Sequence, residues 1–205
     1  MLFNLRPLKL FVLLFAATAL VAAATLDQAK QLYEEGQYEQ AEAALREVTA
    51  SEPENAKAHF LLGMTLLERS KLDEAQSEFA KGSGEGVEPD QLNVGLARLH
   101  IERQQMDQAL ARLDEAHGQN ANNPDVYYYR GLVRANRKEF GGAAADLEKA
   151  IEMKPGNAKA HYYAGLSYNG LNRPDKMVEH FQTFLKLAPD APEADRVRSL
   201  LRNVR

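Results

Sequence analysis

Small and apolar residues recur at helical spacing through the segment 124–157, which reads PDVYYYRGLVRANRKEFGGAAADLEKAIEMKPGN. These positions are Gly131, Phe140, Ala143, Leu147 and Ala150. The last three are spaced by four and by three residues, which places them on one face of a helix. The pattern predicts two amphipathic helices, 125–136 and 140–153, folded back on each other. Pro155 and Gly156 then end the unit, because they break a helix and form a turn.

The same pattern returns every 34 residues along most of the chain. The small position of the second helix holds Ala41, Ala75, Ala109, Ala143 and Met177. The bulky position four residues later holds Leu45, Phe79, Leu113, Leu147 and Phe181. The small position of the first helix holds Ala29, Gly63, Ala97, Gly131 and Gly165. A single helical hairpin cannot bury both of its apolar faces, so five such units must stack on one another. The sequence therefore predicts an all-α repeat fold.

Four motifs within these units match a known repeat consensus. They are Leu62-Gly63-x2-Leu66, Gly165-x2-Tyr168, Ala75-x3-Phe79 and Pro155. The pattern resembles the tetratricopeptide repeat, a helix–turn–helix unit of 34 residues. The resemblance implies a right-handed α-solenoid over residues 25–191, with repeats at 22–55, 56–89, 90–123, 124–157 and 158–191. Residues 192–205 carry an apolar stripe among charges and are expected to form the capping helix that a solenoid needs.

Local features predict where the repeats differ from one another. Thr25 and Gln28 have the spacing of a capping box at the start of the first helix. Three glycines within residues 82–86 predict a shortened second helix, because each costs about 1 kcal/mol relative to alanine inside a helix. Together with the polar segment 118–123 they flank the third repeat, where we expect the solenoid to flex. Pro174 fits the first turn of its helix, since the N–H that it lacks has no partner there.

Residues 1–24 have the layout of a secretory signal peptide. Arg6 and Lys9 precede an apolar run over residues 11–21, and three alanines ending at Ala24 provide a cleavage site. We predict cleavage after Ala24 and a location outside the cytoplasm, in a bacterial periplasm or secreted; an uncleaved anchor is the alternative. The run is shorter than the ~20 residues that cross a bilayer, so no membrane span is expected after cleavage. The sequence has no cysteine and hence no disulfide.

The charge balance excludes two classes of partner. Cleavage would remove two of the 25 basic residues and none of the 29 acidic ones, so the net charge would go from −4 to −6. An acidic chain without a basic stripe is unsuited to nucleic acid or to an anionic membrane surface.

No motif in the sequence indicates an enzyme, a metal site or a cofactor. His59 and His161 occupy the same place three repeats apart, roughly 25 Å or more if helices pack ~8–10 Å apart, which is too far for one ion. The remaining three histidines lack ligand-like spacing, so we interpret all five as packing residues. Because the repeats and the tail account for the whole mature chain, no residues remain for a catalytic domain.

The resemblance places the first helices of successive repeats along a concave groove that binds a protein or peptide. The residues predicted to contact the partner are Phe60, Met64, Arg98, Tyr128, Leu132, Asn136, Tyr162, Leu166 and Asn169. Tyr128 and Tyr162 are expected to stand side by side there, while Tyr129 and Tyr163 are expected to pack between repeats. We therefore predict a non-catalytic scaffold or adaptor of the cell envelope. The alternatives are a permanent subunit of an envelope complex or of a homo-oligomer, and a binder of a small ligand or glycan.

Overall fold

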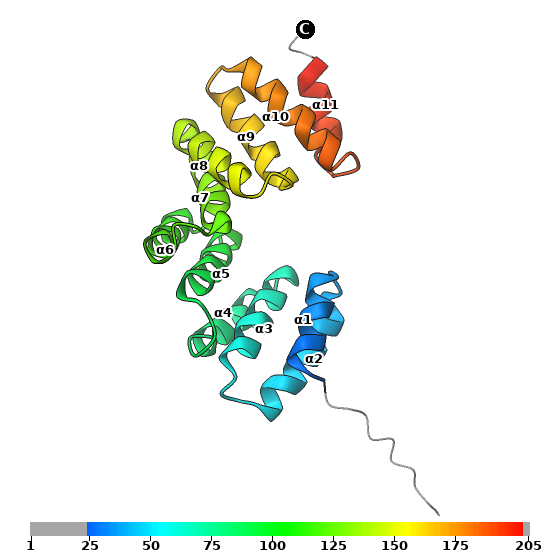
Figure 1. Cartoon of the computed structure of the whole chain (residues 1–205), viewed down its shortest axis with the longest axis vertical. Coiled ribbons are helices and arrows are strands. Elements are labelled where there is room, and N and C mark those ends of the chain that lie inside the picture. Colours follow the sequence, from blue (N-terminus) through cyan, green and yellow to red (C-terminus); the bar gives the residue numbers. More distant parts are fainter. Residues whose placement is uncertain (1–23, 203–205) are drawn as a thin grey trace, which may run out of the picture.

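The computed structural model describes residues 24–202, and within this range it contains eleven α-helices and no strand. They are α1 (Leu26–Glu34), α2 (Tyr38–Ser51), α3 (Ala56–Glu68), α4 (Leu72–Lys81), α5 (Pro89–Glu102), α6 (Met106–Gln119), α7 (Pro124–Asn136), α8 (Phe140–Met153), α9 (Ala158–Gly170), α10 (Pro174–Leu187) and α11 (Ala194–Arg202). Five helical pairs follow one another along an elongated array, and α11 closes its far end (Figure 1). The predicted all-α solenoid is confirmed.

Helix starts follow the local sequence closely. The backbone N–H of Gln28 donates to Oγ1 of Thr25 at 3.3 Å, and the N–H of Thr25 donates back to Oε1 of Gln28 at 3.1 Å. This is the predicted capping box, which satisfies two N–H groups that have no partner within the helix. Asn55 and Asn157 cap α3 and α9, where each accepts the N–H three residues later at 3.1 Å. Pro174 lies in the first turn of α10, as expected.

The turn inside each repeat depends on one residue in the left-handed region. These residues and their φ angles are Gly36 (75°), Ser70 (57°), Gln104 (60°), Lys138 (62°) and Asn172 (55°). The residue that follows each of them donates its N–H to a carbonyl five residues back, as Lys71 does to Leu66 at 2.9 Å. That bond satisfies a terminal carbonyl of the helix. Only the first repeat has glycine there, so in the other four the capping geometry must offset the strain of an L-residue.

The small residues of the first helices allow close approach of the second helices. A Cβ added to Gly63 would lie 2.7 Å from a ring carbon of Phe79. One added to Gly165 would lie 2.5 Å from the ring of Phe181 in the same way. The alanines of the second helices are likewise fully buried, as at Ala143. The 34-residue pattern of small residues is therefore a pattern of helix contacts.

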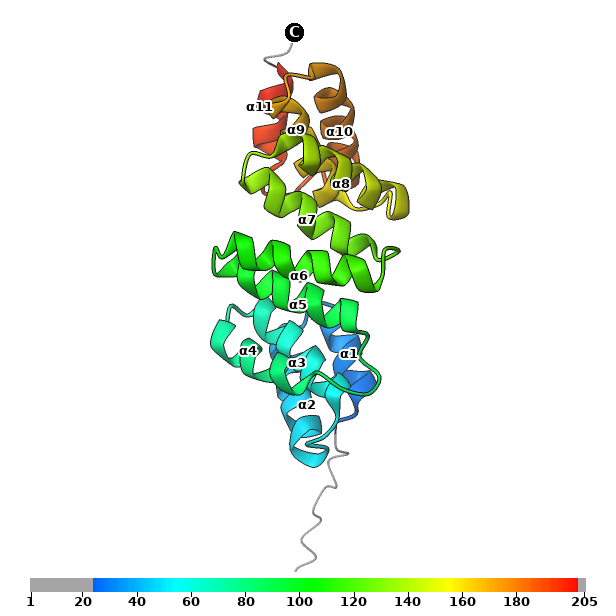
Figure 2. The ribbon, with the colours of Figure 1, turned by 90° about the vertical axis from the view of Figure 1, so that its left-hand side faces the viewer.

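The first helices of neighbouring repeats lie backbone against backbone, as α3 does with α5, α5 with α7 and α7 with α9, whereas the backbones of neighbouring second helices stay farther apart. The array therefore curves with the first helices on its inner side. Figures 1 and 2 show this arrangement, with α6 and α8 lying outside α5 and α7. We call the surface of the first helices the inner face.

The glycines of residues 82–86 shorten α4 as predicted, to 10 residues against 14 in each of the other second helices. The loop is also packed. A Cβ on Gly82 would lie 2.9 Å from the backbone nitrogen of Phe60, and one on Gly84 would lie 2.9 Å from Cβ of Ala56. The glycines therefore let the loop lie against α3. In the third repeat, which these glycines precede, α5 and α6 both have 14 residues.

A series of ion pairs joins the second, third and fourth repeats each to the one before it. Arg103 contacts Asp73 at 2.6 Å, and Arg137 contacts Asp107 at 2.6 Å. Arg69 begins the series with a longer contact of 3.7 Å to Glu39. Both partners recur at intervals of 34 residues. The acidic side chains are almost fully exposed, so each pair contributes at most about 1 kcal/mol. In the fifth repeat the arginine is replaced by Leu171, and the series ends.

Helix α11 lies where the first helix of a sixth repeat would lie. Arg196 comes 34 residues after Tyr162 and its Nη1 lies 3.5 Å from the tyrosine hydroxyl. Val197 is fully buried against α10, and Ala194 is nearly so, as a capping helix requires. The predicted signal peptide, apart from Ala24, and the last three residues of the predicted capping segment lie outside the described residues. In the part of the chain that is described, no helix combines the length and apolar character needed to cross a membrane.

Candidate functional site

Several hollows open between the helices. Four of them contain predicted partner-binding residues, and in one, of about 380 Å³ beside α1 and α3, that residue is Phe60 alone. The largest, which we call the central cleft, has a volume of about 760 Å³ and is bordered by α5, α7 and α9. A second hollow of about 440 Å³ lies at the start of α5 and α7, facing α3; we call it the α3–α5 hollow. A third, the α7–α9 hollow, measures about 270 Å³.

Eight of the nine predicted residues border one of these hollows. Phe60 and Met64 line the α3–α5 hollow; Arg98, Tyr128, Leu132 and Asn136 line the central cleft; Asn136, Leu166 and Asn169 line the α7–α9 hollow. The predicted residues are thus spread over three neighbouring depressions. The largest group lies in the central cleft, which makes this cleft the strongest candidate site.

The expected pairing of Tyr128 with Tyr162 is wrong. Tyr162 does not border the central cleft, and its ring packs 5.4 Å from that of Phe184 beneath α10 and α11. The ring beside Tyr128 is that of Tyr163, with centroids 6.5 Å apart. Tyr163 and Tyr129 both line the central cleft, although the sequence placed them between repeats. The sequence could not place Tyr162, because its burial depends on how α11 and Phe184 cover it.

Three tyrosines therefore form the wall of the central cleft. The rings of Tyr128 and Tyr129 meet edge to face at 4.8 Å, and Tyr163 extends the group onto α9. Burial raises the pKa of all three hydroxyls, and that of Tyr129 reaches about 12. The hydroxyls therefore stay protonated at neutral pH and are available as hydrogen-bond donors.

Arg98 lies at the junction of four repeats. Its guanidinium hydrogen-bonds the carboxylate of Glu68, and its Nη1 lies 3.8 Å from Sδ of Met64. It also stands over the ring of Tyr129, 5.5 Å from the centroid, in a cation–π contact. Burial alone would lower the pKa of Arg98, but Tyr129 and Glu68 raise it overall. Its charge is thus largely compensated inside the protein, and its first role is to hold the inner face together.

Comparisons with known proteins agree with this architecture. The family model described as the tetratricopeptide repeat matches residues 26–82, 94–158 and 134–192. The chain belongs to the tetratricopeptide repeat family. No curated protein sequence matches it.

Solved structures of other tetratricopeptide repeat proteins share the fold. The chain is 24% identical to YrrB, described as a TPR protein with an unusual peptide-binding site, over 84% of this chain and 89% of that one, with a TM-score of 0.58. It is 21% identical to a thermophilic TPR protein of Thermus thermophilus, TTC0263, over 86% of this chain and 96% of that one, with a TM-score of 0.73. A MamA structure is 24% identical over 80% and 96%, with a TM-score of 0.61. At these identities the likeness concerns the fold.

Two of the histidines in this tetratricopeptide repeat array lie together, which the sequence analysis missed. Nδ1 of His161 is 3.2 Å from Nδ1 of His180, and Nε2 of His161 is 3.2 Å from the carbonyl oxygen of Pro155. Nε2 of His180 in turn lies 3.1 Å from a carboxylate oxygen of Glu148. The periodicity contained a signal for this pair. His59 and Glu78 are also 19 residues apart, and they are in contact at 2.5 Å in the second repeat.

The hydrogen bonds assign the protons of the histidine pair. The Pro155 carbonyl only accepts, so Nε2 of His161 carries a proton and its Nδ1 accepts one from His180. His180 then donates from Nδ1 to His161, and its Nε2 faces the carboxylate of Glu148. Burial and the charge of His180 lower the pKa of His161, although its bond to Pro155 acts in the opposite direction. These groups hold α8, α9 and α10 together.

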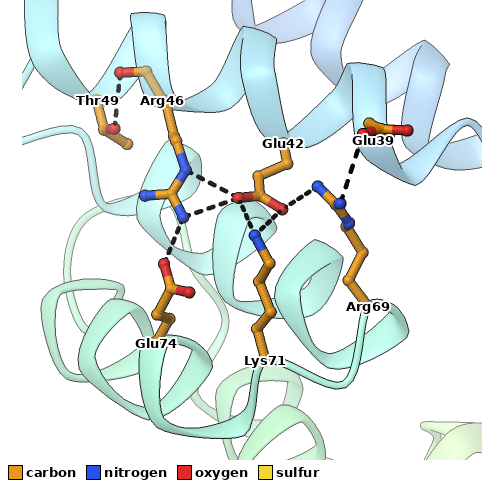
Figure 3. A network of polar contacts seen from close by, with 7 residues as sticks. All are labelled: Glu39, Glu42, Arg46, Thr49, Arg69, Lys71 and Glu74. Carbon is orange, nitrogen blue, oxygen red and sulfur yellow. Dashed lines mark hydrogen bonds and ion pairs between the residues drawn. The ribbon is translucent and has the colours of Figure 1, made fainter.

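A buried carboxylate joins the first two repeats (Figure 3). Glu42 of α2 accepts hydrogen bonds from Arg46 at 2.9 Å, Lys71 at 2.8 Å and Arg69 at 2.5 Å, and Arg46 also pairs with Glu74. Burial alone would raise the pKa of Glu42, but these cations lower it to about 2. Asp146 has a similar place between Arg130 and Arg134 in the fourth repeat. Both clusters connect helices and have a structural role.

Within residues 24–202, no three or more potential ligand side chains are grouped so as to hold a metal ion. The ionisable groups described above are satisfied by neighbours that fix helices in place. What the arrangement offers chemically is a surface of aromatic rings, hydroxyls and amides in the central cleft, which suits binding.

Proposed function

We propose that this protein is a non-catalytic scaffold or adaptor that binds a peptide or a helix of another protein on its inner face. The observation that carries this proposal is the central cleft, where Tyr128, Tyr129 and Tyr163 from two repeats form one wall. Tyrosine offers a large contact area with few rotatable bonds and a polar tip, which suits recognition. The description of YrrB as having a peptide-binding site supports the proposal by analogy of fold.

Polar groups in the same cleft suit the backbone of a bound chain. The side chains of Gln104 and Asn136 line it beside the tyrosine hydroxyls. Asn136 donates one N–H to the carbonyl of Leu132 at 3.1 Å, which leaves its amide oxygen free to accept from a ligand. Aromatic anchors with a few placed hydrogen-bonding groups are typical of peptide recognition.

Site-specific photo-crosslinking tests the location. A benzophenone side chain placed at Gln104, in the cleft, should crosslink to a partner protein in an extract of the source cells. The same group at Gln182, an exposed glutamine on α10, provides the control. Crosslinking from Gln182 but not from Gln104 would move the site away from the inner face. Crosslinking of two copies of this chain would favour the homo-oligomer instead.

Substitution then tests the anchors. Tyr129→Ala with Tyr163→Ala should weaken binding of the crosslinked partner by about 2–4 kcal/mol, the usual range for two anchor residues. Tyr127→Ala is the matched control, because Tyr127 lies on the same helix but contacts His117 and Arg130 instead of the cleft. Equal losses of binding in the control and in the double variant would mean that the tyrosines act through stability alone.

We also propose export to the cell envelope, on the basis of the basic residues and apolar run within residues 1–24. N-terminal sequencing of the protein from its native source should begin at Thr25 or within about two residues of it, because signal peptidase cuts after small residues. A protein that keeps Met1 and stays in the cytoplasm would rule this out.

A further inference from the structure

The charges in the central cleft are unevenly matched. Arg98 and Glu68 form an ion pair, as described above. Three other charged side chains line the central cleft. They are Lys159 on α9, Glu102 at the end of α5 and Glu193 just before α11. None of these three forms an ion pair with any other residue in the range 24–202. The cleft therefore carries one more acid than base.

Glu193 is the most distinctive of these residues. It is half-buried, yet within the described chain no side chain donates a hydrogen bond to its carboxylate. It borders the central cleft together with Tyr128 and Tyr163, and its charge raises the pKa of both hydroxyls further. A partly desolvated carboxylate beside two aromatic rings is a favourable place for a cation, which gains from the charge and from the ring faces.

The neighbouring α3–α5 hollow, like the central cleft, is lined by more acidic than basic side chains. Its lining holds Glu88, Asp90 and Asp125 against the single base Lys154, which is paired with Asp125 at 2.8 Å. The two depressions meet where Met64, on the wall of one, contacts Arg98, on the wall of the other. Both depressions therefore carry more acidic than basic side chains, and the charge of Arg98 between them is compensated by Glu68.

We propose that the occupant of this face is an extended, basic segment of a partner protein, with a lysine or arginine held between Glu193 and the rings of Tyr128 and Tyr163. The proposal rests on the function proposed above and specifies its ligand. The net charge, −4 for the full sequence and −6 after the proposed cleavage, attracts such a segment over distance and repels acidic ones. An extended segment can reach both depressions, and the tyrosine hydroxyls and amides supply partners for its backbone.

Selection from a random peptide library tests this directly. Twelve-residue peptides displayed on phage would be selected at low and at physiological salt on the immobilised protein, with elution by change of salt. We expect enriched sequences to carry a net positive charge and an aromatic or aliphatic residue near a lysine or arginine. Representative synthetic peptides should then bind about 10–100-fold more weakly to Glu193→Lys, because a charge-assisted contact is lost and a repulsive one is gained.

Lys159→Glu is the matched control, since it changes a charge by the same amount in the same cleft but in the opposite direction. It should preserve or strengthen binding of the basic peptides. Glu102→Lys provides a second test if Glu193→Lys fails to fold. Enriched peptides that are acidic or neutral, but still need Tyr129 and Tyr163, would overturn the basic-segment proposal and leave peptide binding intact. Failure to enrich any peptide that depends on the cleft would overturn both.

Discussion

The glycines of the first helices provide a test of how the repeats are held together. Gly165→Ala adds one methyl group to α9. Its Cβ would lie 2.5 Å from two ring carbons of Phe181 and 3.1 Å from a third. Phe181 is fully buried, and its ring cannot turn aside as the end of a flexible side chain can. The helices α9 and α10 must therefore separate.

The expected change in the free energy of unfolding is the sum of two opposing effects. Overpacking a core site costs about 1–3 kcal/mol, and a rigid ring at this distance puts Gly165→Ala at the upper end. Alanine is favoured over glycine in a helix by about 1 kcal/mol. We therefore expect a net destabilisation of about 2 kcal/mol. Gly141→Ala in α8 isolates the second term, because nothing lies within 4 Å of its added Cβ. That variant should be stabilised by about 0.4–1 kcal/mol.

Urea unfolding followed by circular dichroism measures both variants. Since repeat arrays can unfold in parts, hydrogen exchange of the amides in α9 and α10 should accompany it. The loss in Gly165→Ala should appear first in these two helices. If Gly165→Ala is as stable as Gly141→Ala, the small residue is not required for helix contact, and our explanation of the 34-residue pattern is wrong.

Three further predictions concern charges and loops. The folded-state pKa of Glu42 is depressed to about 2 from its ordinary value of 4.5. The contribution of Glu42 to the free energy of unfolding should therefore be complete above pH 4.5 and be lost as the pH falls from there toward 2. Glu42→Gln should lower the free energy of unfolding by roughly 2 kcal/mol at pH 7, and urea titrations of this variant should show a weaker loss of stability in acid. The pKa of His161 is lowered from 6.5, chiefly by burial, so the fifth repeat should weaken as the pH falls below that value and the buried imidazole must take up a proton. Thermal unfolding at pH 5 and pH 8 should show this for the wild type and not for His161→Gln. Limited proteolysis should cut within residues 118–123 before residues 82–86, because Gly82 and Gly84 pack against α3; a first cut at the glycines would contradict that packing.

The sequence alone determined the fold to a useful level of detail. Regular spacing of small and bulky residues predicted the helices over 125–136 and 140–153, which α7 and α8 match except for one residue at the start of α7. Capping at Thr25 and the place of Pro174 could also be predicted, because these features depend on neighbours only a few residues away. Shortening of α4 followed from glycine propensity in the same way.

Tertiary structure decided which tyrosines reach the central cleft. Tyr162 and Tyr163 are adjacent on α9 and point about 100° apart around the helix axis, so they face different neighbours. Only the packing of Phe184 and α11 shows that Tyr162 is covered and that Tyr163 stands beside Tyr128. The pairing of His161 with His180 and the compensation of Arg98 by Glu68 likewise arise between helices from different parts of the sequence. Periodicity fixes which face of a helix is buried, whereas contacts among three or more helices fix what each side chain at the edge of that face touches.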